Sequence, residues 1–326
     1  MGTTTVSDVA VNISGAIAAQ AQIVAEKALV HAIFARVENV KPNAGKSVTF
    51  RLPTKFTAAT TALTEGADPT TTTLAVTDTA LTVAQYGLLF EVSDLLMKTD
   101  PWPVMEMFVP LLAVNYAETV DKLCQAVLVG GSAVQYANGV AARANVAQKS
   151  TITDWQKVSS TLKKNGAREI MSPIGAAVGI NTYPVPKSYV AIVHPDVARD
   201  IQGLSGFVLA HQYADPTKQL PGEFGMIPGA GSIRFCQSPA ADDGTAQTGA
   251  AGTTVYKNDG ANFYVYLTCC FGEEAFAWAK WGDVEYTGDD GTTGLKLTKR
   301  AGWKIAGKAG RLNQNFLYRV EAAATL

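Results

Sequence analysis

Residues 54–82 read TKFTAATTALTEGADPTTTTLAVTDTALT, a stretch in which 12 residues are threonine. Alternation of apolar and polar side chains in SVTFRL (47–52) and LAVTDTALTV (74–83) predicts two strands. We therefore expect a long two-stranded hairpin with its tip near 63–69. An isolated hairpin is only marginally stable in water, and TEGADPTTTT (64–73) offers almost no apolar surface for packing. The partner that stabilises this hairpin is therefore expected to be another chain.

Helical patterns lie on both sides of the hairpin. Upstream, Ser7 is a predicted N-cap, and apolar residues recur at helical spacing over 8–36, which indicates an amphipathic N-terminal helix. Downstream, Asp100-Pro101 is a typical helix start, because proline at the first helical position loses no hydrogen bond. A Gly-Gly pair is a typical stop. Between these signals we expect one long helix over 101–129.

The second half of the chain mixes short helices and strands. Thr153 and Gln156 form a capping-box pattern, which predicts a short helix that ends before an Asn-Gly pair. SYVAIVHP (188–195) has the composition of a buried strand, and PDVARDIQGL (195–204) that of a brief helix. This order of elements indicates a compact region that follows the long helix.

Loops and returning strands complete the chain. We expect a Gly- and Pro-rich loop over 213–225 and, from its Ala-, Gly- and Thr-rich composition, an exposed loop over 239–260. From NFYVYLTCCF (262–271) onward, the alternation of side chains predicts strands. These strands should pair with earlier ones, such as GLLFEVSD (87–94).

Composition excludes several functional classes. A formal net charge of −1 argues against a strongly basic surface for nucleic acid. No apolar stretch approaches the roughly 20 residues that span a bilayer, and the opening MGTTTVSDVAVNISG has no basic segment before an apolar one. We therefore expect neither membrane insertion nor secretion. The cysteines show no metal-ligand spacing and are expected to be buried thiols in a reducing compartment, namely Cys124, Cys236, Cys269 and Cys270.

Motifs for catalysis are weak in this sequence. AGKS (44–47) is similar to part of a phosphate-binding loop, but Val40 occupies the position of the partner glycine, and a strand-like segment follows instead of a helix. The three histidines are far apart and fit no metal-binding motif. His194 with a nearby acid such as Asp196 would permit a hydrolase, although no nucleophile motif accompanies the pair. We expect no catalytic residue, no cofactor and no metal.

The ordered set of segments resembles a known family. LTEGADP (63–69), QYG (85–87), EVSD (91–94), VHPDVARDI (193–201), GFV (206–208), LPGEFG (220–225), GWK (302–304) and RVE (319–321) match, in order, the major capsid proteins of N4-like tailed bacteriophages. The resemblance implies an α+β chain with the HK97-type capsid fold. It divides the chain into an N-terminal arm (1–45), an extended hairpin loop with the first peripheral-domain strand (46–93), a peripheral domain with the spine helix (94–150), an axial domain (151–262) and returning strands (263–326).

The resemblance also implies a function and a set of contact residues. The chain would assemble with itself into hexamers and pentamers of an icosahedral shell around double-stranded DNA, which it would contact only weakly. Portal, scaffolding or decoration proteins would be further partners, in the host bacterial cytoplasm and then in the virion. The alternatives are an encapsulin-like compartment shell protein and a cytoplasmic hydrolase. Candidate contacts between subunits are Thr64, Glu65, Gly66, Pro69 and Glu223, and candidate structural turn residues are Pro195, Pro221, Gly222 and Gly225.

Overall fold

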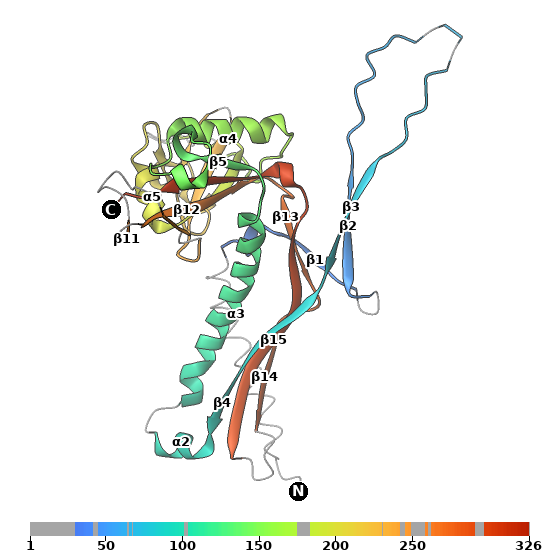
Figure 1. The fold of residues 1–326 in the computed structure, drawn as a ribbon. Helices are drawn as coiled ribbons and strands as arrows, with labels where there is room; N and C mark the ends of the chain where they lie inside the picture. Colours follow the sequence, from blue (N-terminus) through green and yellow to red (C-terminus); the bar gives the residue numbers. More distant parts are fainter. Residues whose placement is uncertain are drawn as a thin grey trace.

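The computed structural model describes residues 30–41, 45–63, 65–66, 68–100, 104–174, 183–229, 231–241, 245–248, 258–259, 262–290 and 297–325. These residues form a five-stranded sheet, a nine-stranded sheet and a separate two-stranded ribbon. Figure 1 shows the ribbon projecting away from the two sheets and the helices that pack on them. The mixture of helices and strands confirms the predicted α+β class.

The helices are α2 (Asp94–Thr99), α3 (Val104–Val129), α4 (Ile152–Lys164) and α5 (Pro195–Gln202), with 3-10 turns η1 (Ala32–Phe34), η2 (Ala137–Gly139), η3 (Arg143–Asn145), η4 (Ala210–Gln212), η5 (Pro216–Lys218) and η6 (Gln314–Phe316). The strands are β1 (Arg36–Asn39), β2 (Ser47–Pro53), β3 (Val76–Thr82), β4 (Ala84–Ser93), β5 (Val134–Tyr136), β6 (Ser188–Val193), β7 (Val208–Leu209), β8 (Glu223–Ile227), β9 (Ser232–Gln237), β10 (Thr245–Thr248), β11 (Asn258–Asp259), β12 (Asn262–Phe271), β13 (Phe276–Lys280), β14 (Glu285–Asp290), β15 (Thr298–Arg311) and β16 (Leu317–Ala323).

The five-stranded sheet, called the elongated sheet below, is built around β15. Its order is β1-β13-β15-β14, and β4 also pairs with β15. The β4–β15 ladder is antiparallel and extends from Ser93↔Thr298 to Ala84↔Gly307. This ladder confirms the predicted pairing of 87–94 with the last strands of the chain.

Helix α3 lies against the elongated sheet along much of its length (Figure 1). The indole Nε1 of Trp303 on β15 donates to Asn115 Oδ1 at 3.2 Å, and the Trp303 ring meets Tyr116 edge-on. Farther along the helix, Cys124 and Leu128 are completely buried. The 26-residue helix confirms the long helix expected over 101–129, of which 101–103 lie outside the described residues.

The C-terminal end of α3 is held by the second sheet. Arg319 of β16 donates through Nη1 to the carbonyl oxygens of Val129 and Gly131, groups that a helix end leaves without an intrahelical donor. The Arg319 Nε also donates to Glu321 Oε1 at 2.7 Å. The buried Glu321 carboxylate thus holds the Arg319 side chain in place, and Arg319 connects the end of α3 to β16.

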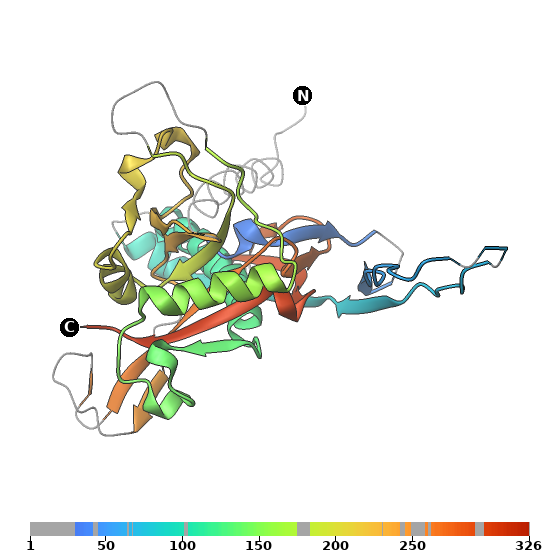
Figure 2. The ribbon, with the colours of Figure 1, turned by 90° about the horizontal axis from the view of Figure 1, so that it is seen from above.

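The nine-stranded sheet, called the central sheet below, has the order β5-β16-β12-β6-β9-β8-β7, with β10 and β11 also paired to β12. Every residue of β6 is buried, which confirms the strand predicted in 188–195. Trp155 of α4 meets Phe235 of β9 edge-on at 4.9 Å between ring centroids. Figure 2 shows α4 lying along β16, on the side of the sheet that it covers.

Three sequence predictions of local structure were wrong in their bounds. The capping box of α4 is made by Thr151 and Asp154, two residues before the predicted pair at Thr153 and Gln156. The loops expected over 213–225 and 239–260 contain the start of β8 and the strands β10 and β11. These strands form because β9 and β12 supply pairing edges that the local sequence does not reveal.

The predicted N-terminal helix over 8–36 lies mostly outside the described residues, and its described end was wrong. There the chain forms η1 and then β1, which pairs in parallel with β13. The Asp121 carboxylate of α3 accepts hydrogen bonds from the backbone N–H of His31 at 2.6 Å and from that of Val30 at 3.1 Å, and it also meets His31 Nδ1 at 2.6 Å. This buried contact with α3, together with the pairing of β1 with β13, takes the place of the α-helix expected at residues 30–36.

Candidate assembly site

The hairpin predicted from the threonine-rich stretch begins as a regular antiparallel ladder. Strands β2 and β3 pair from Ser47↔Thr82 to Pro53↔Val76. The last backbone hydrogen bond runs from the Thr54 N–H to the Ala75 carbonyl, at 2.9 Å. The stem of the hairpin is therefore a strand pair of seven residues on each side.

The stem is anchored to the elongated sheet by a small apolar cluster. Phe50 and Leu81 are buried there against Ala277 and Ala279 of β13. A Cβ on Gly310 of β15 would lie 2.1 Å from Leu81 Cδ2, so the leucine can pack only because this residue is glycine. The face of the stem that packs on the elongated sheet thus has a small apolar core.

Beyond the stem, the two limbs of the hairpin (54–75) have no such support. Every described residue of the limbs is exposed, and within the described part none of 55–74 takes part in a backbone–backbone hydrogen bond. Backbone N–H and C=O groups normally find partners in a folded protein. In a single copy of this chain, water is the partner of these limbs, and Figures 1 and 2 both show them extending away from the sheets.

The tip of the hairpin is a turn at Glu65 and Gly66, which confirms the tip predicted near 63–69. Gly66 has φ +78°, a left-handed conformation that glycine adopts without strain. Glu65, Gly66 and Pro69 are exposed, and Thr64 lies outside the described residues. The predicted contact residues at the tip are thus available to another chain.

An ion pair crosses the stem and was not found from the sequence. Arg51 donates from Nε and Nη2 to the two carboxylate oxygens of Asp78, at 3.0 and 3.1 Å. This hydrogen bonding, together with the arginine charge, lowers the pKa of the Asp78 carboxyl, and the pKa of Arg51 is raised in turn. Both charged residues lie in the two predicted strands, but that they face each other becomes clear only once the register of the strands is known.

The Glu223 side chain is buried, so its predicted role in contacts between subunits is not supported. Its carboxylate accepts hydrogen bonds from Arg234 Nε at 2.7 Å and from the Tyr213 hydroxyl at 2.8 Å, and the Leu220 N–H also donates to it. Burial and this nearby carboxylate raise the pKa of the Tyr213 hydroxyl. The Glu223 side chain is 0% exposed and is bound entirely within its own chain.

The predicted turn residues have different roles in the structure. Pro221 and Gly222 do form a turn, in which Gly222 has φ +70° and a Cβ would lie 2.5 Å from the Gln237 carbonyl oxygen. Pro195 is instead the first residue of α5. Gly225 lies within β8, where a Cβ would lie 2.4 Å from the Phe207 ring, so it permits close packing and not a turn.

The geometry around His194 does not fit the hydrolase alternative. The His194 Nδ1 accepts from the Asp196 N–H at 3.2 Å and so caps α5. A histidine that acts as general base through Nε2 needs Nδ1 to donate to a carboxylate. The Asp196 carboxylate accepts from the Tyr266 hydroxyl at 2.6 Å, and its Oδ2 lies 3.6 Å from His194 Nδ1, which is beyond hydrogen-bonding distance. The pair is therefore arranged as a helix cap.

The thiols are equally unsuited to nucleophilic chemistry. All four cysteines are free and buried, as predicted. Burial raises the pKa of Cys124 and that of Cys236 to about 12, which keeps both protonated at neutral pH.

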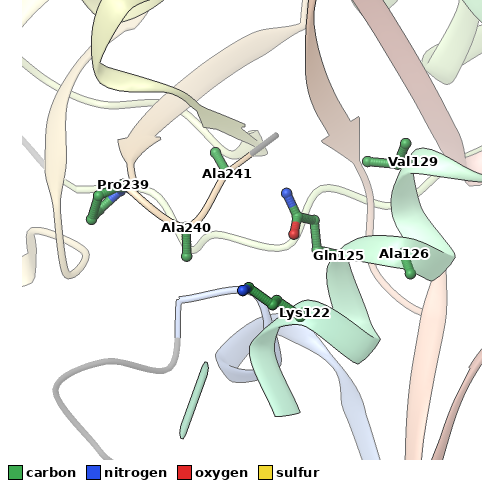
Figure 3. A pocket seen from close by; sticks show the side chains of 7 residues that line it. All are labelled: Lys122, Gln125, Ala126, Val129, Pro239, Ala240 and Ala241. Atoms are coloured by element: carbon green, nitrogen blue, oxygen red, sulfur yellow. The ribbon is translucent and has the colours of Figure 1, made fainter. Parts of the chain in front are cut away.

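A cavity of about 450 Å³ lies between the C-terminal half of α3 and the segment after β9. Figure 3 shows its lining residues, which are Lys122, Gln125, Ala126, Val129, Pro239, Ala240 and Ala241. Lys122 is the one ionisable side chain among these described lining residues. Over the described ranges, no cluster of metal-ligating side chains occurs, and no helix is long and apolar enough to cross a membrane.

Within the described residues of one subunit, the exposed limbs of the hairpin have neither a buried core nor a backbone ladder. The fold and the hairpin thus define a component of a protein assembly. The chain belongs to the phage capsid protein family, whose sequence model matches residues 76–306. It is a major capsid protein, a structural component of the head shell of a bacteriophage.

Solved capsid structures share the fold. The chain is similar to the capsid protein of Ralstonia phage GP4, with 13% identity, a TM-score of 0.66, and coverage of 91% of this chain and 92% of that one. It is similar to the capsid protein of Helicobacter pylori bacteriophage KHP30, with 12% identity, a TM-score of 0.61 and 88% coverage of both chains. It is also similar to the capsid protein of cyanophage P-SCSP1u, with 13% identity, a TM-score of 0.58, and coverage of 89% of this chain and 87% of that one. No curated protein matches the sequence. The fold is the HK97-type capsid fold.

Proposed function

We propose that this chain assembles with itself into hexamers and pentamers that form an icosahedral shell around packaged double-stranded DNA. The observation that carries the proposal is the hairpin, whose limbs (54–75) are exposed on all described residues and unpaired beyond the Thr54–Ala75 hydrogen bond. In the assembly, a neighbouring subunit would replace water as the partner of these limbs. A contact of this kind, repeated around a ring, converts modest energies into a stable assembly.

The tip residues are the proposed contact points. Glu65 and Gly66 form the exposed turn, and Pro69 follows on the returning limb. Together with Thr64 they would lie on the adjacent subunit of the ring. Glu223 is left out of this set, because its carboxylate is buried against Arg234.

The parts of the subunit have proposed places in the shell. The central sheet with α4 and α5 would form the axial domain at the centre of each ring, and the elongated sheet with α3 the peripheral domain. The N-terminal arm would leave from the His31–Asp121 contact, where it is held on α3. The ordered motifs further favour the N4-like capsid proteins as the nearest group within the family.

The other proposed partners are DNA and further proteins of the virus particle. With a formal net charge of −1, the inner surface would contact DNA only weakly and without sequence preference. Portal, scaffolding or decoration proteins would join during assembly in the host cytoplasm. We propose no enzymatic activity, since the candidate His194 serves as a helix cap.

The test removes the limbs of the hairpin and keeps its stem. Residues 55–74 are replaced by Asn-Gly, a pair suited to closing a two-stranded turn, so that the β2–β3 ladder and the Phe50–Leu81 anchor remain. We expect a folded subunit with an unchanged thermal unfolding midpoint that forms neither rings nor shells in negative-stain electron microscopy. A same-length control keeps the limbs but replaces 70–73 with serines and should still assemble. Closed particles of normal size from the shortened variant would refute the proposed role of the hairpin.

A further inference from the structure

The first turn of α5 is held by a histidine, a residue type whose charge changes near neutral pH. His194 is the N-cap of this helix, and its Nδ1 accepts a hydrogen bond from the Asp196 N–H at 3.2 Å. Helix N-caps are ordinarily Ser, Thr, Asp or Asn, whose side chains accept such a bond across the physiological pH range. A histidine accepts through Nδ1 only while that nitrogen carries no proton. The cap of α5 therefore depends on the protonation state of His194.

A second group of the same residue lies close to this nitrogen. The Asp196 Oδ2 is 3.6 Å from His194 Nδ1 and is not hydrogen-bonded to it in the observed arrangement. An unprotonated Nδ1 is an acceptor and selects the Asp196 N–H, whereas a protonated Nδ1 is a donor and is suited to the carboxylate. Addition of one proton thus transfers Nδ1 from the backbone of Asp196 to its side chain. The Asp196 N–H then loses the acceptor that caps the helix.

The groups that contact His194 act on its protonation in opposite directions. The Asp196 carboxylate favours a positive imidazole, and so does the Tyr266 ring on β12, whose centroid lies 5.1 Å from that of the imidazole. The amino end of α5 opposes a positive charge, because the helix dipole is positive there. The His194 side chain is 15% exposed, so a proton from solvent can reach it without unfolding of the sheet.

Helix α5 also holds the segment that follows β16. Thr325 donates from its backbone N–H to Asp200 Oδ2 at 2.8 Å and from its hydroxyl to Asp200 Oδ1. The Thr325 carbonyl oxygen accepts from Arg199 Nη2 at 2.6 Å. Arg199 and Asp200 are the charged residues of α5 beyond its first turn, and both are bound at Thr325. A movement of α5 is therefore transmitted to the segment after β16.

We propose that His194 is a pH-sensitive cap, whose protonation loosens the first turn of α5 and, through this helix, its hold on Thr325. Two groups of Asp196 carry the proposal, a donor at 3.2 Å and an acceptor at 3.6 Å from one imidazole nitrogen. Stabilisation by the cap is present while His194 is neutral and is lost as the pH falls and the imidazole gains a proton. The cap belongs to the central sheet and its helices, so the inference does not depend on the proposed assembly through the hairpin.

The experiment measures hydrogen–deuterium exchange of the full chain by mass spectrometry at pH 8 and pH 5. At pH 5 an ordinary histidine is mostly protonated, whereas carboxylates largely keep their charge. His194→Asn is the matched control, because asparagine is a good N-cap and does not titrate. The two chains are compared at equal pH, which removes the intrinsic pH dependence of exchange, and light scattering verifies that they share one assembly state.

We expect equal protection of residues 195–202 in both chains at pH 8, and about threefold to tenfold faster exchange in wild type at pH 5. The peptide that contains Thr325 should change in the same direction by a smaller factor. A ratio between the two chains that is the same at both pH values would overturn the proposal. Faster exchange confined to α5 would overturn its link to the segment after β16.

A second measurement uses the wild-type chain and needs no folded variant. The ¹⁵N NMR spectrum of the imidazole distinguishes a protonated ring nitrogen from an unprotonated one. At pH 8 the Nδ1 of His194 should have the chemical shift of an unprotonated nitrogen, because it accepts from the Asp196 N–H. A proton on Nδ1 at pH 8 would show that the imidazole does not cap α5 and would overturn the proposal.

Discussion

The tip of the hairpin and the turn before β8 have similar sequences and opposite environments. One contains Glu65-Gly66 and the other Gly222-Glu223, and each glycine has a positive φ, +78° and +70°. Glu65 is exposed, whereas the Glu223 side chain is 0% exposed and ion-paired. The difference lies in the surroundings, because Arg234 and Tyr213 both donate to the Glu223 carboxylate, whereas the described part of the subunit places no comparable donors beside Glu65. A short acidic turn motif thus does not by itself indicate an interface.

The largest expected effect comes from Glu223→Ala. Loss of the carboxylate leaves the buried Arg234 guanidinium without its partner, which costs about 3–5 kcal/mol in the free energy of unfolding. Glu65→Ala is the matched control and should change that free energy by less than about 0.5 kcal/mol. Urea unfolding of both variants measures the contrast. Equal effects would mean that the environments of the two carboxylates are alike.

An intermediate effect is expected when each glycine is replaced by alanine. At Gly222 the new Cβ meets the Gln237 carbonyl oxygen at 2.5 Å in addition to the positive φ, so Gly222→Ala should destabilise the fold by about 1–3 kcal/mol. At Gly66 nothing lies within 4 Å, and the exposed tip can rearrange without affecting the core. Thermal unfolding midpoints report the difference. A Gly66→Ala midpoint lowered as far as that of Gly222→Ala would contradict it.

The smallest effect concerns the Arg51–Asp78 pair on the exposed stem. The folded-state pKa of Asp78 lies below its ordinary value, chiefly because of the hydrogen bonds from Arg51. The stabilisation is therefore present above the ordinary carboxyl pKa and is lost as the pH falls through the lowered one. Titration of the Asp78 carboxyl by NMR should give a pKa below the ordinary range in wild type and within it in Arg51→Gln. Identical titration curves would show that the pair does not form in solution.

The local elements were largely predictable from the sequence, because their signals are local. Alternation over 47–52 and 74–83 predicted the stem, and an Asp-Pro start with a Gly-Gly stop predicted α3. The capping box of α4 was misplaced by two residues within a local signal, but the other wrong bounds depend on residues distant in the sequence. The helix expected over 8–36 does not include residues 31–36, where the carboxylate of Asp121, 90 residues away in the sequence, binds the backbone N–H of His31.

The same reason explains which parts of the candidate site were found. The hairpin and its tip follow from composition and turn chemistry, which are properties of one segment. Burial of Glu223 depends on Arg234 in the next strand, and the Arg51–Asp78 pair depends on strand register. Neither pairing nor burial can be obtained from the spacing of residues in a single sequence.

The unladdered limbs of the hairpin also bear on how one chain can occupy positions of different curvature. At about 3.3 Å per residue, a limb of about ten residues can carry its tip at most about 33 Å beyond the stem. Within the described part of the limbs no backbone–backbone hydrogen bond has to break when they bend. A continuous ladder would hold neighbours at one angle. In the proposed hexamers and pentamers, limbs of this kind would let the folded body tilt relative to its neighbour while the tip keeps the same contact.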